Sequence, residues 1–563
     1  MLIFALLCTF AACGKAPSPA APKDETADAP ADTPSPSPEP TIEPEPIPSP
    51  DEGITPDTFV LINDVDQVLE RPHKIQPGTV ATFHGTDVPA YTPWNATADQ
   101  WLTKNIYEGL VYCYMDRPDD IRPLIAESWH VSDDYLTWTF KIREGVKFTD
   151  GTLCDAEAIS KSWYYYHEAS PVTFRIRNIK SWEAREDNIF VVQLSAPCAY
   201  IETTFTELYI LSPTALALYG INDNRAAVGT APYYIKEYVA KDMGRYLEGV
   251  EFICSANTEY YLYERMPVIE TIIIKFNYEE QSLLDNFLSG EYDGFFTSSV
   301  DSYNALLESG LDFSLIRGHN NANPIFLNAR EYPEFSIYEV RKAFNRFIDL
   351  DALNNDLYGG HGLVQSSIWS PNSSGEVPWP EGFYYAPEEG HELLAAAGIQ
   401  ATEVHIETYT GSHIVDYFAA LSSQLAREGI TLEYGKEPPN GGSTYMMRGD
   451  WTVTAGNAGY ANISPYMPWT FILLPEHLIK MVWADLYDPA LYDNMRSEYE
   501  AMISACTWDE MVAHCKTLTD LVQKDYAAMP GVQAPYFAAF NKELKGIVLI
   551  GENHTLLWNY LYY

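Results

Sequence analysis

The chain has 563 residues, of which 46% are apolar and 14% aromatic, so it is long enough for several domains and can fill packed cores. Its 78 acidic and 35 basic residues give a formal net charge of -43, which opposes binding to nucleic-acid phosphates and anionic lipid headgroups. Because the sequence contains no run of 18 apolar residues, it does not predict a membrane-spanning helix.

The first thirteen residues form a short apolar run that ends in small residues, which is typical of an export signal. Residues 10–14 (FAACG) resemble a bacterial lipobox, in which the cysteine thiol receives a diacylglycerol and the cysteine becomes the new N-terminus. The resemblance implies a signal peptide over 1–13 and lipid attachment at Cys13, although Phe10 stands where Leu or Val is usual. We therefore expect an extracytoplasmic protein, lipid-anchored to the outer face of the cell membrane or periplasmic.

Residues 14–56 consist mainly of Pro, Ser, Ala and acidic residues, with twelve prolines between Pro17 and Pro50. Such a segment buries too little apolar surface to offset the entropy of ordering it. Its prolines favour an extended spacer. The segment therefore predicts a disordered tether between the membrane and the folded body.

From residue 57 the chain carries both strand and helix patterns. Residues 136–142 alternate between apolar and polar side chains, as a strand does, and turn residues at 144–145 and 150–151 predict an antiparallel meander. Asp155 is then expected to cap a helix.

Two later regions each follow the order strand, helix, strand. The first consists of a β-branched run over 271–276, a helix stopped by Gly290 and a strand over 293–296. The second places a helix over 415–427 between strands at 404–408 and 430–434. Strands joined by helices in this way predict parallel sheets with covered faces.

A further helix is predicted between these two regions. Ser336 and Glu339 form the pattern of a capping box at its start. One apolar face of this helix contains Val340, Phe344, Phe347 and Ile348. The body is therefore mixed α and β, and clefts between its parts are the expected places for a small ligand.

The common signatures of hydrolases, zinc proteases and nucleotide-binding proteins do not occur in the chain. His391 and Glu392 begin a zinc-protease pattern, but Ala395 stands where the second His is required. His405 and His413 flank a strand-to-helix junction where they could meet, but we expect a surface or capping role for each. The sequence therefore predicts no catalytic residue, no metal site and no cofactor.

Several segments, in the same order along the chain, resemble the extracytoplasmic solute-binding proteins of ABC importers. The resemblance is to solute-binding protein family 5, the class with oligopeptide-, dipeptide- and nickel-binding members. The segments are 105–110 (NIYEGL), 123–129 (PLIAESW), 138–151 (WTFKIREGVKFTDG), 229–233 (GTAPY), 257–261 (NTEYY), 287–293 (FLSGEYD) and 340–349 (VRKAFNRFID). Ala231 replaces the second glycine of the family's G-T-G-P-Y element. The resemblance runs from about residue 57 to the C-terminus.

This resemblance implies an α/β, lobed fold like that of type II periplasmic binding proteins, with two mixed α/β lobes and an additional antiparallel region. Lobe I would comprise 57–100, 220–323 and 531–563, with an inserted region over 101–219, and lobe II would comprise 324–530. The lobes would close on a small-molecule or peptide-like ligand, and an ABC permease with its ATPase would recognise the closed form. The implied protein is a receptor, not an enzyme, and we expect a monomer that binds no nucleic acid.

In peptide-binding members of the family, an Asp three residues beyond the Trp of a G-W dipeptide pairs with the α-ammonium group of the peptide. Aligned without gaps, the Trp position is Ala458 and the Asp position is Ala461 in this chain. Burying an ammonium group without a charged partner is costly, so a neutral or N-terminally blocked solute is expected. The candidate ligand-binding residues are the nearby hydrogen-bonding and stacking side chains Asn457, Tyr460, Asn462 and Trp469. The alternative is that these residues form an ordinary loop after a strand.

A second function fits the tether equally well. The chain would then be a surface-anchored hydrolase or glycan-binding lipoprotein that acts without a permease. A permease and an ATPase encoded beside the chain would favour the receptor, whereas neighbouring polysaccharide- or peptide-degrading enzymes would favour the alternative.

Overall fold

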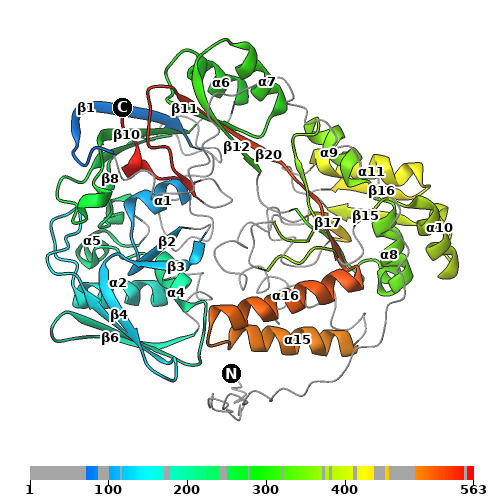
Figure 1. Ribbon diagram of the computed structural model, residues 1–563, viewed down its shortest axis with the longest axis horizontal. Coiled ribbons are helices and arrows are strands. Elements are labelled where there is room, and N and C mark those ends of the chain that lie inside the picture. The colour runs from blue at the N-terminus through cyan, green and yellow to red at the C-terminus, as the bar shows by residue number, and fades with distance from the viewer. Residues whose placement is uncertain are drawn as a thin grey trace, which may run out of the picture. The chain divides into compact units, whose positions relative to one another are not determined.

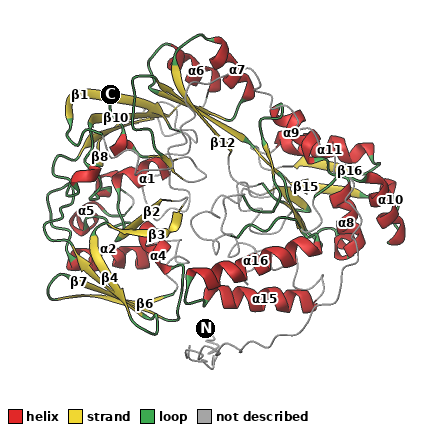
Figure 2. Cartoon of the chain, viewed as in Figure 1, coloured by secondary structure: helices red, strands yellow, loops and turns green. Residues whose placement is uncertain are grey.

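The computed structural model describes residues 71–85, 100–114, 117–169, 178–221, 223–239, 250–276, 279–319, 323–370, 375–379, 383–409, 415–436, 451–455, 489–550 and 555–563 (Figure 1). They belong to one compact unit, Pro56–Tyr563. Cys13, the predicted signal peptide and the predicted tether lie outside the described residues. Within these ranges helices and strands are mixed along the chain (Figure 2). None of the described helices is both long enough and apolar enough to span a bilayer.

The largest sheet gathers seven strands from distant parts of the chain. In spatial order they are β12 (Phe313–His319), β20 (Pro535–Asn541), β11 (Gly294–Thr297), β1 (Gln76–His84), β10 (Ile269–Phe276), β9 (Val250–Ala256) and β8 (Tyr233–Val239). β1 is parallel to both of its neighbours, and the other neighbouring pairs are antiparallel. The predicted unit of β10, α6 (Glu280–Leu288) and β11 is confirmed as parallel, with β1 inserted between its two strands.

Both faces of this sheet are covered near β11 and β20. Phe295 and Phe537 pack with α6 and α7 (Val300–Glu308) in one apolar cluster. Phe296 follows Phe295, and Phe540 follows Ala539 of the same cluster; both phenylalanines lie in the main core on the other side. This alternation is the period of two that a strand imposes on its side chains. Figure 1 shows α6 and α7 beside β11 and β12.

A second sheet, antiparallel throughout, forms between residues 126 and 194. Its order is β4 (Ala126–Val131), β5 (Thr137–Ile142), β7 (Ile189–Leu194) and β6 (Ile179–Arg185). The alternation that predicted β5 is confirmed, because Trp138, Phe140 and Ile142 are buried. The chain after β5 does not add another strand to this sheet, since Lys147 and Leu153 form only an isolated bridge.

Short elements pack around the antiparallel sheet. They are α1 (Gln100–Ile106), β2 (Val111–Tyr114), β3 (Arg117–Pro123), α2 (Ala156–Ala169), α4 (Ile201–Glu207) and α5 (Pro213–Tyr219). Asp155 Oδ1 accepts a hydrogen bond of 2.8 Å from the amide of Ala158, so the predicted cap of α2 is confirmed. Trp163 of α2 lies edge-on to Phe190 and stacks with Phe205, with ring centroids 5.0 and 6.0 Å away.

Residues 325–533 contain three small sheets and six helices of the described part. The sheets pair β13 (Ile325–Leu327) with β17 (Val453–Ala455) and β18 (Ala528–Met529), β14 (Leu363–Val364) with β19 (Val532–Gln533), and β15 (His405–Tyr409) with β16 (Thr431–Lys436). The helices are α8 (Tyr338–Arg346), α9 (Leu350–Tyr358), α10 (Pro387–Ala396), α11 (Val415–Arg427), α15 (Pro489–Ile503) and α16 (Trp508–Asp525). Near the C-terminus β21 (Leu549–Ile550) pairs with β22 (Thr555–Leu556).

The second strand–helix–strand prediction is also confirmed. β15 and β16 are parallel, and α11 has the bounds expected from its apolar period. Gly429 follows α11 with a φ of +85°, a left-handed conformation that commonly ends a helix.

The capping box predicted for α8 is wrong. A 3-10 turn over Pro333–Ser336 takes up the serine, and Ile337 occupies the N-cap with no side-chain hydrogen bond. The predicted apolar face is correct, since Val340, Phe344, Phe347 and Ile348 are all buried.

Arg341 of α8 is a buried charged residue whose partners lie at the end of α16 and before α8. Its side chain, only 3% exposed, forms an ion pair with the carboxylate of Asp525 at the end of α16. Nε also donates to the carbonyl oxygen of Asp525 at 2.8 Å, and Nη1 donates to that of Phe335 at 2.9 Å. A cation at a helix C-terminus is favourable, and this one joins two helices that are far apart in sequence.

Candidate functional site

The predicted ligand-binding residues Asn457, Tyr460, Asn462 and Trp469 lie outside the described residues. The strand before them, β17, is buried along its whole length. On one side it pairs with β13, where Asn328 Nδ2 donates to the carbonyl oxygen of Trp451 at 2.6 Å. On the other side Thr408 Oγ1 donates to the carbonyl oxygen of Val453 at 2.7 Å. The chain therefore enters the predicted ligand segment from a strand held on both sides.

Two connections lead between the small sheets and the seven-stranded sheet. One leads from β12 to β13, between residues 319 and 325. The other leads from β18 through β19 to β20, between residues 529 and 535. Each connection therefore joins a strand of the seven-stranded sheet to a strand of a small sheet.

The two connections touch each other at Gly531. A Cβ atom added there would lie 1.9 Å from the carbonyl oxygen of Asn323, so the backbones meet without room for any side chain. Asn323 Nδ2 donates to the carbonyl oxygen of Val532 at 3.3 Å. Gln365 bonds to both connections. Its side-chain Oε1 accepts from the backbone amide of Asn323 at 3.0 Å, and its backbone amide donates to the carbonyl oxygen of Gly531 at 3.1 Å.

Buried side-chain hydrogen bonds support the segment that contains Gln365. Gln523 of α16 accepts from Ser367 Oγ and from the amide of Ile368, both at 3.1 Å. Trp369 Nε1 donates to Thr519 Oγ1 at 2.9 Å. Since a buried polar group without a partner is costly, this network fixes the segment against α16.

A pocket of about 500 Å³ lies beside the same segment. Its wall combines the aromatic rings of Trp379, Phe383, Tyr384 and Tyr385 with the carboxylates of Asp349 and Asp351 and the amide of Gln365. The Asp349 carboxylate also accepts from the amide of Ala352 as the cap of α9. This pocket could not be predicted from the sequence, because its wall comes from four stretches of chain with no common motif.

Three of the motifs matched separately in the sequence meet around the carboxylate of Glu108. Tyr260 donates to its Oε1 at 2.6 Å, and Tyr261 and Thr230 donate to its Oε2 at 2.9 Å each. Glu108 is only 3% exposed, so these three hydroxyls replace the water that it would have at the surface. Asn105, in the same motif as Glu108, holds the chain near the C-terminus, because its Oδ1 accepts from the amide of Trp558 at 2.9 Å.

The charge of Glu108 affects its two tyrosine partners. Burial raises the pKa of Tyr260 and of Tyr261 well above the usual range, and the nearby negative charge of Glu108 raises it further. Both phenols therefore stay protonated and keep donating to the carboxylate. The side chains of Glu108, Thr230, Tyr260 and Tyr261 use these polar atoms to hold the chain after α1 against the chain around β8 and β9. We therefore assign this group a structural role.

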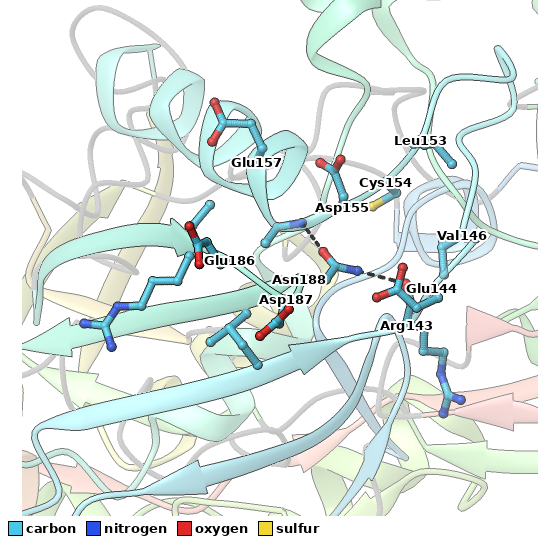
Figure 3. A pocket seen from close by; sticks show the side chains of 15 residues that line it. Arg143, Glu144, Val146, Leu153, Cys154, Asp155, Glu157, Glu186, Asp187 and Asn188 are labelled. Atoms are coloured by element: carbon cyan, nitrogen blue, oxygen red, sulfur yellow. Dashed lines mark hydrogen bonds between the residues drawn. The ribbon is translucent and has the colours of Figure 1, made fainter.

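An open pocket of about 1030 Å³ lies at one end of the antiparallel sheet (Figure 3). Asp187 and Asn188 form the β6–β7 turn there with φ angles of 59° and 56°. Asn188 Oδ1 accepts from the amide of Ala156 at the start of α2 at 2.8 Å, and Nδ2 donates to the carbonyl oxygens of Ile142 and Arg143 at 3.2 and 3.4 Å. These bonds tie the turn to the helix, so the polar atoms of Asn188 are used in holding the fold.

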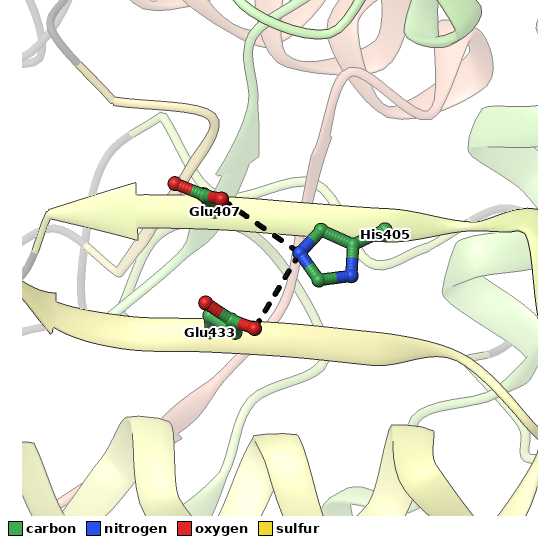
Figure 4. A group of neighbouring side chains, drawn as sticks. All are labelled: His405, Glu407 and Glu433. Carbon is green, nitrogen blue, oxygen red and sulfur yellow. Dashed lines mark ion pairs between the residues drawn. The ribbon is translucent and has the colours of Figure 1, made fainter.

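The described residues include one group of side chains able to hold a metal ion. His405, Glu407 and Glu433 bring three potential ligand atoms within 4.8 Å of one another on β15 and β16 (Figure 4). The sequence analysis considered His405 only with His413, which lies outside the described residues. The signal that was missed is the spacing of two, which places His405 and Glu407 on one face of a strand.

Comparisons with known proteins match most of the chain. A model of the family described as bacterial extracellular solute-binding proteins, family 5 Middle, matches residues 120–476. Glutathione-binding protein GsiB of Shigella flexneri serotype 5b (strain 8401) is 25% identical over 501 residues, which cover 83% of this chain and 91% of that protein. NikA from Brucella suis, solved in complex with Fe(III)-EDTA, matches with a TM-score of 0.72 and 17% identity over 86% of this chain and 99% of its own. OppA from Haemophilus influenzae, in complex with RPPGFSPFR, matches with a TM-score of 0.67 and 16% identity over 87% and 99%.

Proposed function

The chain belongs to the bacterial extracellular solute-binding proteins of family 5, and on that premise we propose that it captures a peptide or peptide-like solute between two lobes for an ABC importer. Its place in this family makes it an extracytoplasmic solute-binding receptor and not an enzyme. The lobed α/β fold predicted from the sequence is confirmed by the structural similarity to NikA and OppA. The family match over more than half of the chain is the observation that carries the proposal.

In the proposed division, lobe I comprises 57–100, 220–323 and 531–563 with the inserted region 101–219, and lobe II comprises 324–530. The grouping of strands supports it, because the seven-stranded sheet takes its strands from the first set of ranges and β13, β15, β16, β17 and β18 come from the second. The two connections that meet at Gly531 would then act as the hinge. Ligand contacts from both lobes would favour the closed form, which the permease and its ATPase would distinguish from the open form.

The proposed ligand is a neutral or N-terminally blocked peptide-like solute. Ala461 stands where peptide-binding members of the family carry the carboxylate that pairs with the α-ammonium group. The name of the similar GsiB, a glutathione-binding protein, supports a ligand of small-peptide size. Asn457, Tyr460, Asn462 and Trp469 would bind it through neutral hydrogen bonds and stacking.

The proposed anchor is a lipid on Cys13, followed by the tether over 14–56. Polyproline segments extend by about 3 Å per residue, so such a tether would let the receptor reach a permease from its attachment point. Labelling of cells with a radioactive fatty acid tests this proposal. Wild-type protein should take up label and the C13A variant should not; equal labelling of the two would contradict it.

Native mass spectrometry of the purified protein tests the ligand proposal most directly, because a closed receptor retains its solute. We expect a retained species without a free α-ammonium group. In calorimetry, an N-acetylated tripeptide should bind more tightly than the same peptide with a free amine. The double variant N457A/N462A should lose this binding, whereas N355A, an exposed Asn on α9, should keep it.

The two parts of the proposal fail in different ways. Tight binding of free-amine peptides that survives in N457A/N462A would contradict the assigned ligand residues while leaving the receptor function standing. Recovery of the protein with no affinity for any small solute, together with turnover of a substrate, would contradict the receptor function itself.

A further inference from the structure

Three side chains with metal-binding atoms share one exposed face of the parallel pair β15 and β16. His405 and Glu407 are two positions apart on β15, and Glu407 lies directly opposite Glu433 of β16 in the strand register. The side chains are 52%, 53% and 54% exposed in that order. The buried residues between them, Ile406 and Leu432, point to the opposite face, which α11 covers. Figure 4 shows the imidazole turned toward both carboxylates.

Two carboxylates directly opposite each other on neighbouring strands repel, and this arrangement normally lowers the stability of a sheet. The formal net charge of -43 makes the surrounding field more negative still. Here the ring nitrogen Nε2 of His405 lies 3.8 Å from Glu407 Oε1 and 3.5 Å from Glu433 Oε1. The carboxylate pair is therefore arranged around a third group, and a cation bound among the three would remove the repulsion.

The distances between the three atoms suit a transition-metal ion. Bonds of about 2.0–2.2 Å from a tetrahedral ion to nitrogen and oxygen place neighbouring ligand atoms about 3.4 Å apart. The two distances of 3.5 and 3.8 Å from His405 are close to this value, and all three atoms lie within 4.8 Å of one another. Small side-chain rotations at the surface would bring them to bonding geometry.

The types of ligand narrow the choice of ion. An imidazole nitrogen is a poor ligand for Ca²⁺ and Mg²⁺, which prefer oxygen, but it suits Zn²⁺, Ni²⁺ and Cu²⁺. A neutral imidazole and two carboxylates balance the charge of one divalent ion. We propose that His405, Glu407 and Glu433 form a site for a divalent transition-metal ion of the zinc or nickel class, separate from the proposed solute cleft.

Such an ion would also join two strands that, among the described residues, form a sheet of their own. β15 and β16 form a two-stranded sheet, and small sheets of this size depend on their surroundings for stability. With ligands from both strands, the ion would fix their register. Thr452, just before β17, donates from its Oγ1 to the carbonyl oxygen of Glu407 at 2.7 Å. An ion that fixes β15 would therefore also support the chain where it enters β17.

Calorimetry with Zn²⁺ and with Ni²⁺, on chelator-treated protein that carries no polyhistidine tag, tests the proposal. Wild-type protein should bind one ion with a dissociation constant in the micromolar range or tighter, and E433Q and H405Q should each weaken it. Loss of an outer-shell partner alone costs about 10- to 100-fold in affinity, so loss of a ligand should cost at least that. Both substitutions are at exposed positions, and circular dichroism should confirm that the variants are folded.

A matched control distinguishes this group from an ordinary His–Glu pair. His514 Nδ1 lies 2.7 Å from Glu498 Oε2 on neighbouring helices. H514Q should bind zinc as wild-type protein does. The proposal is overturned if wild-type protein shows no saturable binding of either ion, if E433Q and H405Q bind as tightly as wild type, or if Ca²⁺ binds the site as tightly as Zn²⁺.

Discussion

Replacing Gly531 with Ala should separate the two connections between the sheets. The new Cβ would lie 1.9 Å from the carbonyl oxygen of Asn323 and 2.9 Å from the hydroxyl oxygen of Tyr417. Since carbon and oxygen atoms settle at about 3.4 Å or more, the two backbones must move apart by about 1.5 Å. That shift would break two hydrogen bonds. One runs from the backbone amide of Gln365 to the carbonyl oxygen of Gly531, and the other from Asn323 Nδ2 to the carbonyl oxygen of Val532.

The expected cost follows from these two effects. Overpacking a filled site costs about 1–3 kcal/mol, and each lost hydrogen bond costs about 0.5–1.5 kcal/mol. We therefore expect G531A to lower the free energy of unfolding by about 2–6 kcal/mol. Urea denaturation followed by tryptophan fluorescence and far-ultraviolet circular dichroism measures this difference.

The control is G145A. Gly145 has a φ of +76°, and a Cβ there would meet no atom within 4 Å. Its substitution should cost about 1–2 kcal/mol from the left-handed backbone alone. If G531A is no more destabilising than G145A, the close contact between the two connections does not matter for stability and the reasoning is wrong.

Three further changes test the buried polar groups of the fold. Burial lowers the pKa of His84 to about 4, below the value of about 6.5 in the unfolded chain, so stability is complete above pH 6.5 and falls by about 1.4 kcal/mol per pH unit toward pH 4. H84Q should flatten this slope in urea titrations between pH 7 and 5, and an unchanged slope would refute the assignment. E108Q turns an amide donor toward hydroxyl donors and should cost about 1–3 kcal/mol in the same assay; no loss would argue against the three bonds to Glu108. R341M leaves the buried Asp525 carboxylate unpaired and should cost about 3–5 kcal/mol, whereas R496M, at an exposed ion pair, should cost less than about 1 kcal/mol.

Local patterns predicted the elements whose side-chain period is regular. α11 was predicted over 415–427 because one face of it is apolar and Gly429 ends it, and the structure has the same bounds. β5 was predicted because apolar and polar residues alternate along it, and in the structure every second residue of the strand is buried. The start of α8 was not predicted correctly. Pro333 begins a 3-10 turn, so Ser336 lies one residue before the N-cap position, which Ile337 occupies.

The packing between distant segments could not be predicted from these local patterns. β1 lies between β10 and β11 although its last residue, 84, is 185 positions before the start of β10 at 269 and 210 before the start of β11 at 294. The sequence motifs containing Glu108, Thr230 and Tyr260 each matched the family, but nothing within a single motif indicates that the three side chains meet. The same is true of Gly531, whose missing side chain matters only because Asn323 lies against it.

The candidate site was predicted through family resemblance, not through a pattern in the residues themselves. Asn457, Tyr460, Asn462 and Trp469 were chosen because they surround the position of a missing carboxylate, and this assignment stays a prediction. The metal-binding group of His405, Glu407 and Glu433 depends on strand pairing between positions 26 residues apart, from 407 to 433. Periodicity within β15 places only His405 and Glu407 on one face, and Glu433 joins them through the pairing with β16.

The central claim is that the protein is a hinged receptor that closes around its solute. Small-angle X-ray scattering of solute-free protein, before and after addition of the solute identified by native mass spectrometry, tests it most directly. The radius of gyration should decrease on addition for wild-type protein and stay unchanged for N457A/N462A. Identical scattering profiles for free and fully saturated wild-type protein would contradict the claim.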